Sequence, residues 1–139
     1  GFFLVRACIE AGVQIISLPG AVAFIPALIN SGFPCDKFVF EGFLPHKKGR
    51  KTLLEKIAIE ERTVILYESP HRIIKTLEQI IAYISPDRPI AISRELTKTF
   101  EENLRGTAAE MLEHFKNHKP KGEFVLIVGA ENRKSKSAD

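Results

Sequence analysis

Three polar clusters in the sequence carry the side chain types best suited to chemistry. They are Pro19-Gly20-Ala21, Glu68-Ser69-Pro70-His71-Arg72 and Arg94-Glu95-Leu96-Thr97-Lys98. Each follows an apolar stretch that is typical of a β-strand, and open α/β sheets place their ligand sites just beyond strand ends. Each also has a purely structural interpretation, because Pro-Gly is a common turn, Ser-Pro a common helix start, and mixed-charge loops are usually solvated.

The second and third clusters contain the groups needed to deprotonate a hydroxyl beside a phosphate. Glu68, His71 and Glu95 are the candidate general bases. Arg72, Arg94 and Lys98 are the candidate phosphate contacts. The sequence does not rank the bases: His71 is equally consistent with a first-turn helix residue, and Glu95 with the partner of an arginine.

Positive charge gathers in two short stretches, although the net charge of the chain is only +3. The first stretch, His46 to Lys51, predicts RNA contacts from Lys47, Lys48, Arg50 and Lys51. A solvated loop is the alternative interpretation. The second stretch, Arg133 to Lys136, lies in a polar, lysine-rich tail that we expect to be disordered.

Other kinds of site lack support in the sequence. Glycine-rich phosphate loops and the Gly-x-Ser-x-Gly elbow are missing, so the corresponding nucleotide and hydrolase chemistries are disfavoured. His114 and His118 lie four residues apart, but no cysteine or third histidine completes a metal site, and we predict none. Cys8 and Cys35 have no ligand spacing, which favours a reduced, cytoplasmic setting. No apolar run is long enough to span a membrane.

Helices and strands alternate along the chain, which predicts an α/β fold. We expect strands at 14–18, 38–43, 63–67, 90–93, 100–105 and 123–128. We expect helices from Phe2 to Gly12, from about Val22 or Ala23 to Gly32, around 53–58, from 73 to 84, and from a capping box at Thr107-Ala108-Ala109-Glu110. The chain has no initiating Met and no signal peptide pattern, so we expect it to begin inside a larger protein.

Four motifs in a fixed order make the sequence recognisable. They are Glu41-Gly42-Phe43-Leu44-Pro45, Tyr67-Glu68-Ser69-Pro70-His71-Arg72, Arg94-Glu95-Leu96-Thr97-Lys98 and Lys121-Gly122-Glu123. From Gly1 to about Gly129 the chain resembles the ribosomal RNA small subunit methyltransferase I branch of the tetrapyrrole-methylase-like (class III) methyltransferases. The second and third motifs are the most specific to that branch.

The resemblance implies two α/β domains with S-adenosylmethionine bound in the cleft between them. Residues 1–34 would be a remnant of the N-terminal domain, residues 35–130 a complete C-terminal α/β domain with a mixed sheet, and residues 131–139 a disordered tail. The implied donor contacts are Pro19, Gly20, Val22, Ala23, Tyr67, Glu68, Glu123 and Phe124. Gly1 would be the last residue of a glycine-rich donor loop, so we expect this fragment alone to be inactive.

The resemblance also implies the substrate and the assembly. The methyl group would go to the 2′-hydroxyl of a cytidine in 16S RNA of the small ribosomal subunit, and the enzyme would be a homodimer. Ala21-Val22 departs from the small polar or proline residue usual after Pro-Gly in the family, which leaves only backbone contacts at that turn. The rivals are a class III methyltransferase acting on a corrin precursor or a modified protein histidine (diphthine type), and an RNA module that only binds.

Overall fold

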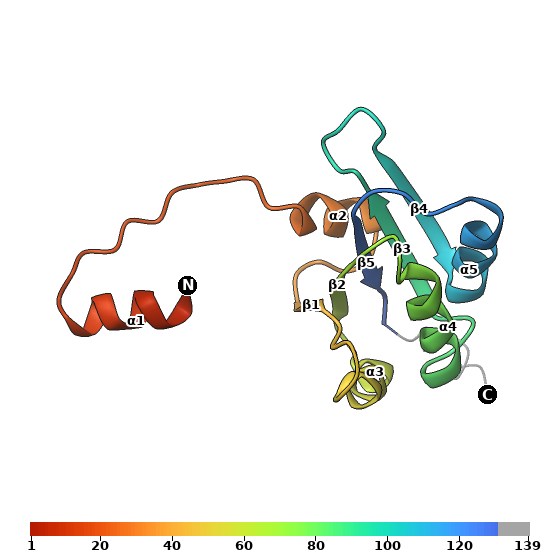
Figure 1. The fold of residues 1–139 in the computed structure, drawn as a ribbon, viewed down its shortest axis with the longest axis horizontal. Coiled ribbons are helices and arrows are strands. Elements are labelled where there is room, and N and C mark those ends of the chain that lie inside the picture. Colours follow the sequence, from red (N-terminus) through yellow and green to blue (C-terminus); the bar gives the residue numbers. More distant parts are fainter. Residues whose placement is uncertain (131–139) are drawn as a thin grey trace.

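The fold is built around one mixed sheet of five strands. The computed structural model describes residues 1–130 of the 139 in the chain. The strand order is β1-β2-β5-β3-β4 (Figure 1). The strands are β1 (Phe38–Phe43), β2 (Thr63–Glu68), β3 (Pro89–Arg94), β4 (Glu102–Thr107) and β5 (Phe124–Val128).

The strand directions bring the ends of four strands to one edge of the sheet. β1 runs parallel to β2, and β5 runs antiparallel to both β2 and β3. The carboxyl ends of β1, β2 and β3 therefore lie beside the amino end of β5. The segments that leave or enter the sheet at this edge include all four recognised motifs.

Helices cover both faces of the sheet. They are α2 (Phe24–Ser31), α3 (Arg50–Ile59), α4 (Ile73–Tyr83) and α5 (Ala108–Asn117). Successive strand residues point to opposite faces, so Val64 and Leu66 join the core shared with α3, α4 and α5, whereas Ile65 joins the core beneath α2. The central strands β2, β3 and β5 are consequently buried almost throughout, as expected for strands covered on both sides.

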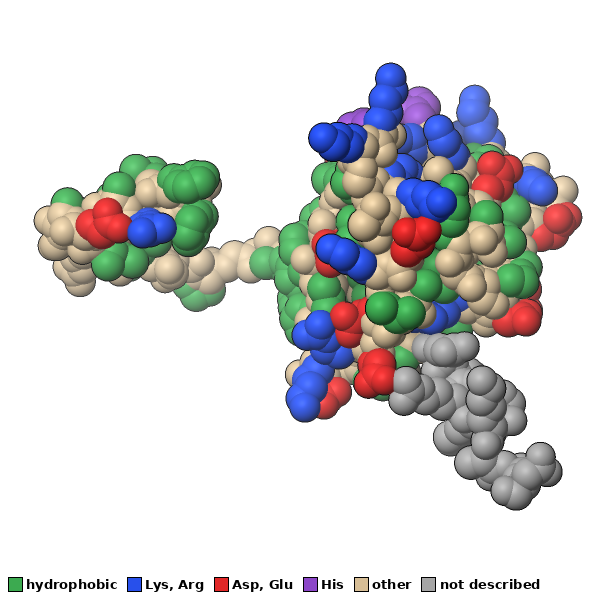
Figure 2. Space-filling model, turned by 90° about the horizontal axis from the view of Figure 1, so that it is seen from below, with side chains coloured by type: hydrophobic (Ala, Val, Ile, Leu, Met, Phe, Trp, Pro, Cys, Tyr) green, Lys and Arg blue, Asp and Glu red, His purple; other side chains and the backbone are tan. Residues whose placement is uncertain are grey.

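The N-terminal part of the chain stands apart from this sheet. Helix α1 (Phe2–Glu10) has no buried residue, and an extended segment, 11–23, joins it to α2 (Figure 1). Apolar side chains on this part are exposed, as the green surface in Figure 2 shows; Phe3 is 83% and Leu18 84% exposed. The prediction of a strand at 14–18 was wrong. Within residues 1–130 that segment pairs with no other strand, and a single strand has no hydrogen-bonded partner to stabilise it.

The other elements follow the sequence closely, and the α/β class with a mixed sheet is confirmed. α2 begins at Phe24, which leaves Pro26 in the first turn. The capping box at Thr107 and Glu110 forms as predicted. β4 was predicted two residues too early, at Phe100–Arg105 instead of Glu102–Thr107.

The domain division at residue 34 stays a prediction. α2 lies before that division, yet Ala27 and Leu28 pack on Ile65, Ala91 and Ile127 of the sheet. The predicted tail, 131–139, lies outside the described residues. No helix within residues 1–130 is both long and apolar enough to cross a membrane.

Candidate active site

A cavity of about 520 Å³ opens at the sheet edge where the motifs meet. Its apolar walls come from Phe43 at the end of β1, Tyr67 in β2, Leu96 after β3, and Phe124 at the start of β5. Polar groups also face it, among them Ser69, Ser93, Glu95, Lys98 and Glu123. Residues far apart in the chain therefore form one site.

The structure gathers most, but not all, of the predicted donor contacts. Ala23, Tyr67, Glu68, Glu123 and Phe124 all line the cavity. Pro19, Gly20 and Val22 do not; they are exposed on the extended segment before α2. The site in this chain is therefore the sheet edge together with the start of α2.

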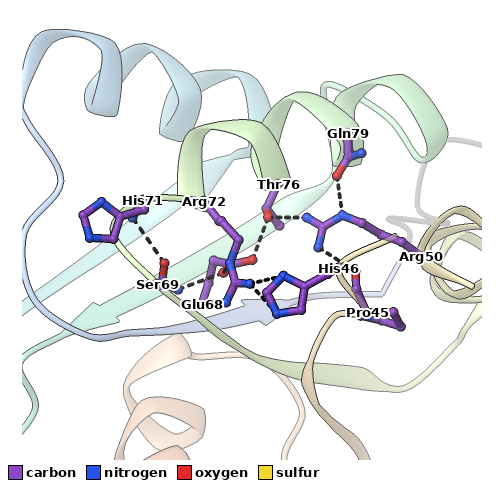
Figure 3. A network of polar contacts seen from close by, with 9 residues as sticks. All are labelled: Pro45, His46, Arg50, Glu68, Ser69, His71, Arg72, Thr76 and Gln79. Atoms are coloured by element: carbon purple, nitrogen blue, oxygen red, sulfur yellow. Dashed lines mark hydrogen bonds and ion pairs between the residues drawn. The ribbon is translucent and has the colours of Figure 1, made fainter. Parts of the chain in front are cut away.

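The buried carboxylate of Glu68, only 4% exposed, is held by three donors (Figure 3). Its Oε1 accepts hydrogen bonds from the Ser69 amide at 2.8 Å and from Arg72 Nε at 3.1 Å. Its Oε2 accepts one from Thr76 Oγ1 at 2.7 Å. This carboxylate therefore fixes the β2–α4 loop, residues 69–72, and carries hydrogen bonds on both oxygens.

Arg50 continues this network into the interior. Its Nη2 donates to Thr76 Oγ1 at 2.7 Å, its Nε to Gln79 at 2.6 Å, and its Nη1 to the Pro45 carbonyl at 3.2 Å. Burial lowers the pKa of the guanidinium, and the nearby Glu68 carboxylate partly offsets this. Arg50 is only 6% exposed, so its predicted contact with RNA is corrected: its charge balances Glu68 inside the protein.

Two histidines have different settings at the β2–α4 loop: His46 lies beside the loop, and His71 is part of it. His46 contacts Arg72, whose Nη1 is 2.7 Å from Nδ1 and 3.0 Å from Nε2 of the ring. Sequence reasoning did not select His46 as a site residue, although it opens the basic stretch. His71 is exposed, does not line the cavity, and points away from the Glu68 network (Figure 3).

Glu95 holds the opposite wall of the cavity. It begins the β3–β4 loop, residues 95–101, with a left-handed φ of 48°, and Thr97 in the same loop has a φ of 65°. Glu95 Oε1 accepts the Glu123 amide at 2.9 Å, and Oε2 lies 3.0 Å from Lys98 Nζ. The Glu123 amide first, and Lys98 second, lower the pKa of this carboxyl below its ordinary value.

Gly122 makes the close approach of Glu95 possible. Its φ is 81°, and a Cβ added there would overlap the Glu95 carboxylate. Only glycine meets both demands without strain. The motif Lys121-Gly122-Glu123 therefore has a structural reason: it brings the start of β5 against the β3–β4 loop.

Basic side chains gather along one edge of the molecule, beside histidines, in Figure 2. Lys47 and Lys48 are exposed in the loop between β1 and α3. Lys51 is exposed on α3, with Nζ 3.7 Å from Glu55 and 5.7 Å from the ring centroid of Tyr83. Arg94 Nη2 pairs with Glu102 at 3.1 Å. The predicted contacts other than Arg50 are thus at least partly accessible to a large ligand.

The residues from 1 to 130 contain no cluster of His, Cys, Asp and Glu that could hold a metal ion. The two histidines four residues apart, His114 and His118, stack on each other with ring centroids 4.5 Å apart.

Comparison with known proteins places the chain in a family. Residues 1–112 match the Tetrapyrrole (Corrin/Porphyrin) Methylases. A relative from Synechocystis sp., ribosomal RNA small subunit methyltransferase I, is 48% identical over 126 residues, which cover 90% of this chain and 45% of the relative. With shares of 45%, 46% and 49%, the chain spans about half the length of the curated relatives it matches.

Solved structures share the fold at low sequence identity. The methyltransferase CobJ superposes with a TM-score of 0.65 at 22% identity, over 93% of this chain and 56% of CobJ. Uroporphyrin-III C-methyl transferase from Thermus thermophilus, complexed with S-adenyl homocysteine, gives 0.57 at 14% identity, over 91% of this chain and 58% of that enzyme. With the match over residues 1–112, the chain belongs to the tetrapyrrole methylase family.

Proposed function

We propose that this chain belongs to an S-adenosylmethionine-dependent methyltransferase that modifies the 2′-hydroxyl of a cytidine in 16S RNA of the small ribosomal subunit. The observation that carries the proposal is the meeting of Tyr67-Glu68, Glu95 and Glu123-Phe124 around one cavity. Curated relatives 40–50% identical bear the name ribosomal RNA small subunit methyltransferase I. The corrin and diphthine enzymes resemble this chain at 22% identity or below, which supports a common fold alone.

The cavity suits a ligand such as S-adenosylmethionine. Its volume of about 520 Å³ lies within the range of roughly 300–1,000 Å³ common for small-molecule sites. Apolar and aromatic walls from Phe43, Tyr67, Leu96 and Phe124 suit an adenine ring, and Ser69 and Ser93 add hydroxyls that can orient polar groups. When bound, the donor supplies a methyl group on a positively charged sulfonium.

The three candidate bases differ in whether their proton-accepting atoms are free of other hydrogen bonds. Both oxygens of Glu68 and of Glu95 already accept hydrogen bonds or ion pairs, and the pKa of Glu95 is lowered, which makes its carboxylate a weaker base. We assign these two carboxylates the role of positioning the cavity walls. His71, which is exposed and does not line the cavity, is the remaining candidate for taking the proton from the ribose hydroxyl. This role requires the RNA, bound outside the cavity, to bring that hydroxyl to His71.

Charge complementarity supports an RNA substrate. Lys47 and Lys48 in the β1–α3 loop, with Arg72, Arg94 and Lys98 near the cavity, would contact phosphates and fix the ribose beside the donor. The proposed setting is the cytoplasm. The proposed assembly is a homodimer, as the family resemblance implies; a single monomeric species in light scattering of the whole protein would contradict it.

The reaction is tested by following the label. Small subunits are incubated with the whole protein and isotopically labelled S-adenosylmethionine, and their nucleosides are analysed by mass spectrometry. We expect label on the ribose of a cytidine. Label on a base, or no label in RNA, would overturn the proposal. In the same assay His71→Ala should lower the rate more than 100-fold, because general-base effects are usually roughly 10²–10⁴-fold. A rate close to that of the wild type would show that His71 is not the base.

A further inference from the structure

A second cavity lies next to the first, on the other side of Glu95. Its volume is about 440 Å³, and its lining residues are Arg94, Glu95, Phe100, Lys121 and Gly122. Glu95 lines both cavities, so its side chain and the Gly122 turn form the wall between them. The proposed methyl transfer uses only the first cavity and leaves this one without a role.

We infer that this second cavity holds one unpaired nucleotide of the RNA substrate, next to the nucleotide that receives the methyl group. The base would stack on Phe100, and the phosphate would bind Arg94 and Lys121. The inference rests on the proposed function for the identity of the substrate. It adds residues, Phe100 and Lys121, that the methyl-transfer chemistry does not require.

Arg94 supplies the first reason. Its side chain is 27% exposed and lines the cavity, and its Nη2 pairs with Glu102 at 3.1 Å. A phosphate in the cavity would bind the accessible part of this guanidinium, since Arg forms its strongest hydrogen bonds with carboxylates and phosphates.

Phe100 supplies the second reason. Its side chain is 77% exposed in the β3–β4 loop, beside two basic residues of the same cavity. An exposed aromatic ring beside Arg and Lys is the usual platform for single-stranded RNA, where bases stack and phosphates are held by cations. An unpaired base fits better than a duplex, because only an unstacked base offers its face to a ring.

The charge of the wall supplies the third reason. The carboxylate of Glu95 would repel a phosphate if it were free. Here it accepts the Glu123 amide at 2.9 Å and pairs with Lys98 at 3.0 Å. Lys121, which directly precedes Gly122, is exposed and lines the cavity. The cavity therefore presents cationic groups while its one carboxylate is already occupied.

The inference is tested by binding, separately from catalysis. Fluorescence anisotropy of a short labelled single-stranded RNA measures the affinity of the whole protein and its variants. Phe100→Ala should weaken binding roughly 5- to 100-fold, the range for loss of one stacked base. Phe100→Tyr should restore most of the loss and Phe100→Leu should not, because a ring and not apolar bulk is required.

Lys121→Ala should weaken RNA binding and reduce its salt dependence by about one phosphate contact. Lys119→Ala is the matched control, because Lys119 is exposed two residues earlier in the chain and does not line the cavity. RNA affinity that is equal in Lys121→Ala and Lys119→Ala, and unchanged by Phe100→Ala, would overturn the inference.

Titration with S-adenosylmethionine separates this inference from the proposed function. All these variants should bind the donor as the wild type does. If the protein binds the donor but its RNA affinity is unchanged by Phe100→Ala and Lys121→Ala, the nucleotide pocket is wrong and the methyltransferase proposal is unaffected. If these variants lose RNA affinity but the wild-type protein binds no donor, the nucleotide pocket is supported and the methyltransferase proposal is wrong.

Discussion

Two loops frame the first cavity, and they are held in place by different means. The β2–α4 loop is held from the protein interior: Glu68, which is 4% exposed, bonds Thr76, and Thr76 bonds buried Arg50. The β3–β4 loop is held at the surface: Glu95 accepts a hydrogen bond from the Glu123 amide, and this contact fits only because Gly122 has no side chain. One wall therefore rests on buried charge and the other on backbone conformation.

The difference matters because the two glutamates look alike in the sequence. Both come at the end of an apolar strand pattern, and both have an arginine within four positions, Arg72 after Glu68 and Arg94 before Glu95. In the structure one carboxylate is part of an interior network and the other is a clamp on a turn. Their substitutions should therefore differ in size and in pH dependence, which the following predictions use.

The largest effect is expected from Glu68→Ala. It leaves the Arg50 guanidinium buried without its balancing carboxylate, which should cost about 3 kcal/mol of unfolding free energy. Urea denaturation of the whole protein measures it. Glu78→Ala, an exposed glutamate on α4, is the control and should change stability by less than about 0.5 kcal/mol. Equal stability of the two variants would contradict the network.

Gly122→Ala should lower the free energy of unfolding by about 2 kcal/mol and weaken donor binding, because it combines a left-handed backbone with a Cβ overlapping Glu95. Gly32→Ala is the matched variant: its φ of 73° is similar, but nothing lies within 4 Å of the added Cβ. It should cost about 1 kcal/mol, from the backbone alone. If Gly122→Ala destabilises the protein no more than Gly32→Ala does, the close contact between Glu95 and the Gly122 turn is not important for stability.

The basic stretch should divide into surface and interior residues. Lys47→Ala with Lys48→Ala should leave stability unchanged and lower the slope of log affinity for RNA against log salt by about 2. Arg50→Ala should instead destabilise the fold, since its guanidinium bonds Thr76, Gln79 and Pro45. Anisotropy at several salt concentrations, with urea denaturation, separates the two. If the double lysine variant has the salt slope of the wild type, Lys47 and Lys48 do not contact RNA phosphates.

The smallest effect concerns the acid side of the stability profile. The folded-state pKa of Glu95 is lowered from its ordinary 4.5 by the Glu123 amide and Lys98. Its stabilisation is therefore fully present above that ordinary value and is lost as the pH falls through the lowered one. The stability gap between wild type and Glu95→Gln should be present at pH 7 and shrink below about pH 4.5. A gap that does not change with pH would contradict the ionised clamp.

Much of this architecture could be predicted from the sequence, because it depends on local patterns. The apolar stripe of α4 and the capping box at Thr107 need only neighbouring residues to form. The segment 14–18 has an equally good strand pattern but no pairing partner within residues 1–130, so a local signal failed. Pattern alone predicts what a segment prefers and not whether a partner is present.

The site shows the same limit. Strand-end placement brought Glu68, Glu95 and Glu123 together as expected for an α/β sheet. Arg50 was misplaced on the surface because its partners, Thr76 and Gln79, lie 26 and 29 residues away. The contact of His46 with Arg72 is equally non-local, and only the folded chain reveals it.

The central claim, that the sheet-edge cavity binds the methyl donor, is tested most directly by filling it. Ala23 lines the cavity at the start of α2 and is exposed, so Ala23→Trp adds bulk there without disturbing the core. Ala82→Trp, on the exposed surface of α4, is the matched control. In calorimetric titration of the whole protein with S-adenosylmethionine, we predict affinity at least about tenfold weaker for Ala23→Trp and unchanged for Ala82→Trp, since a displaced ligand loses most of its buried surface. Wild-type donor affinity in a folded Ala23→Trp variant would contradict the account.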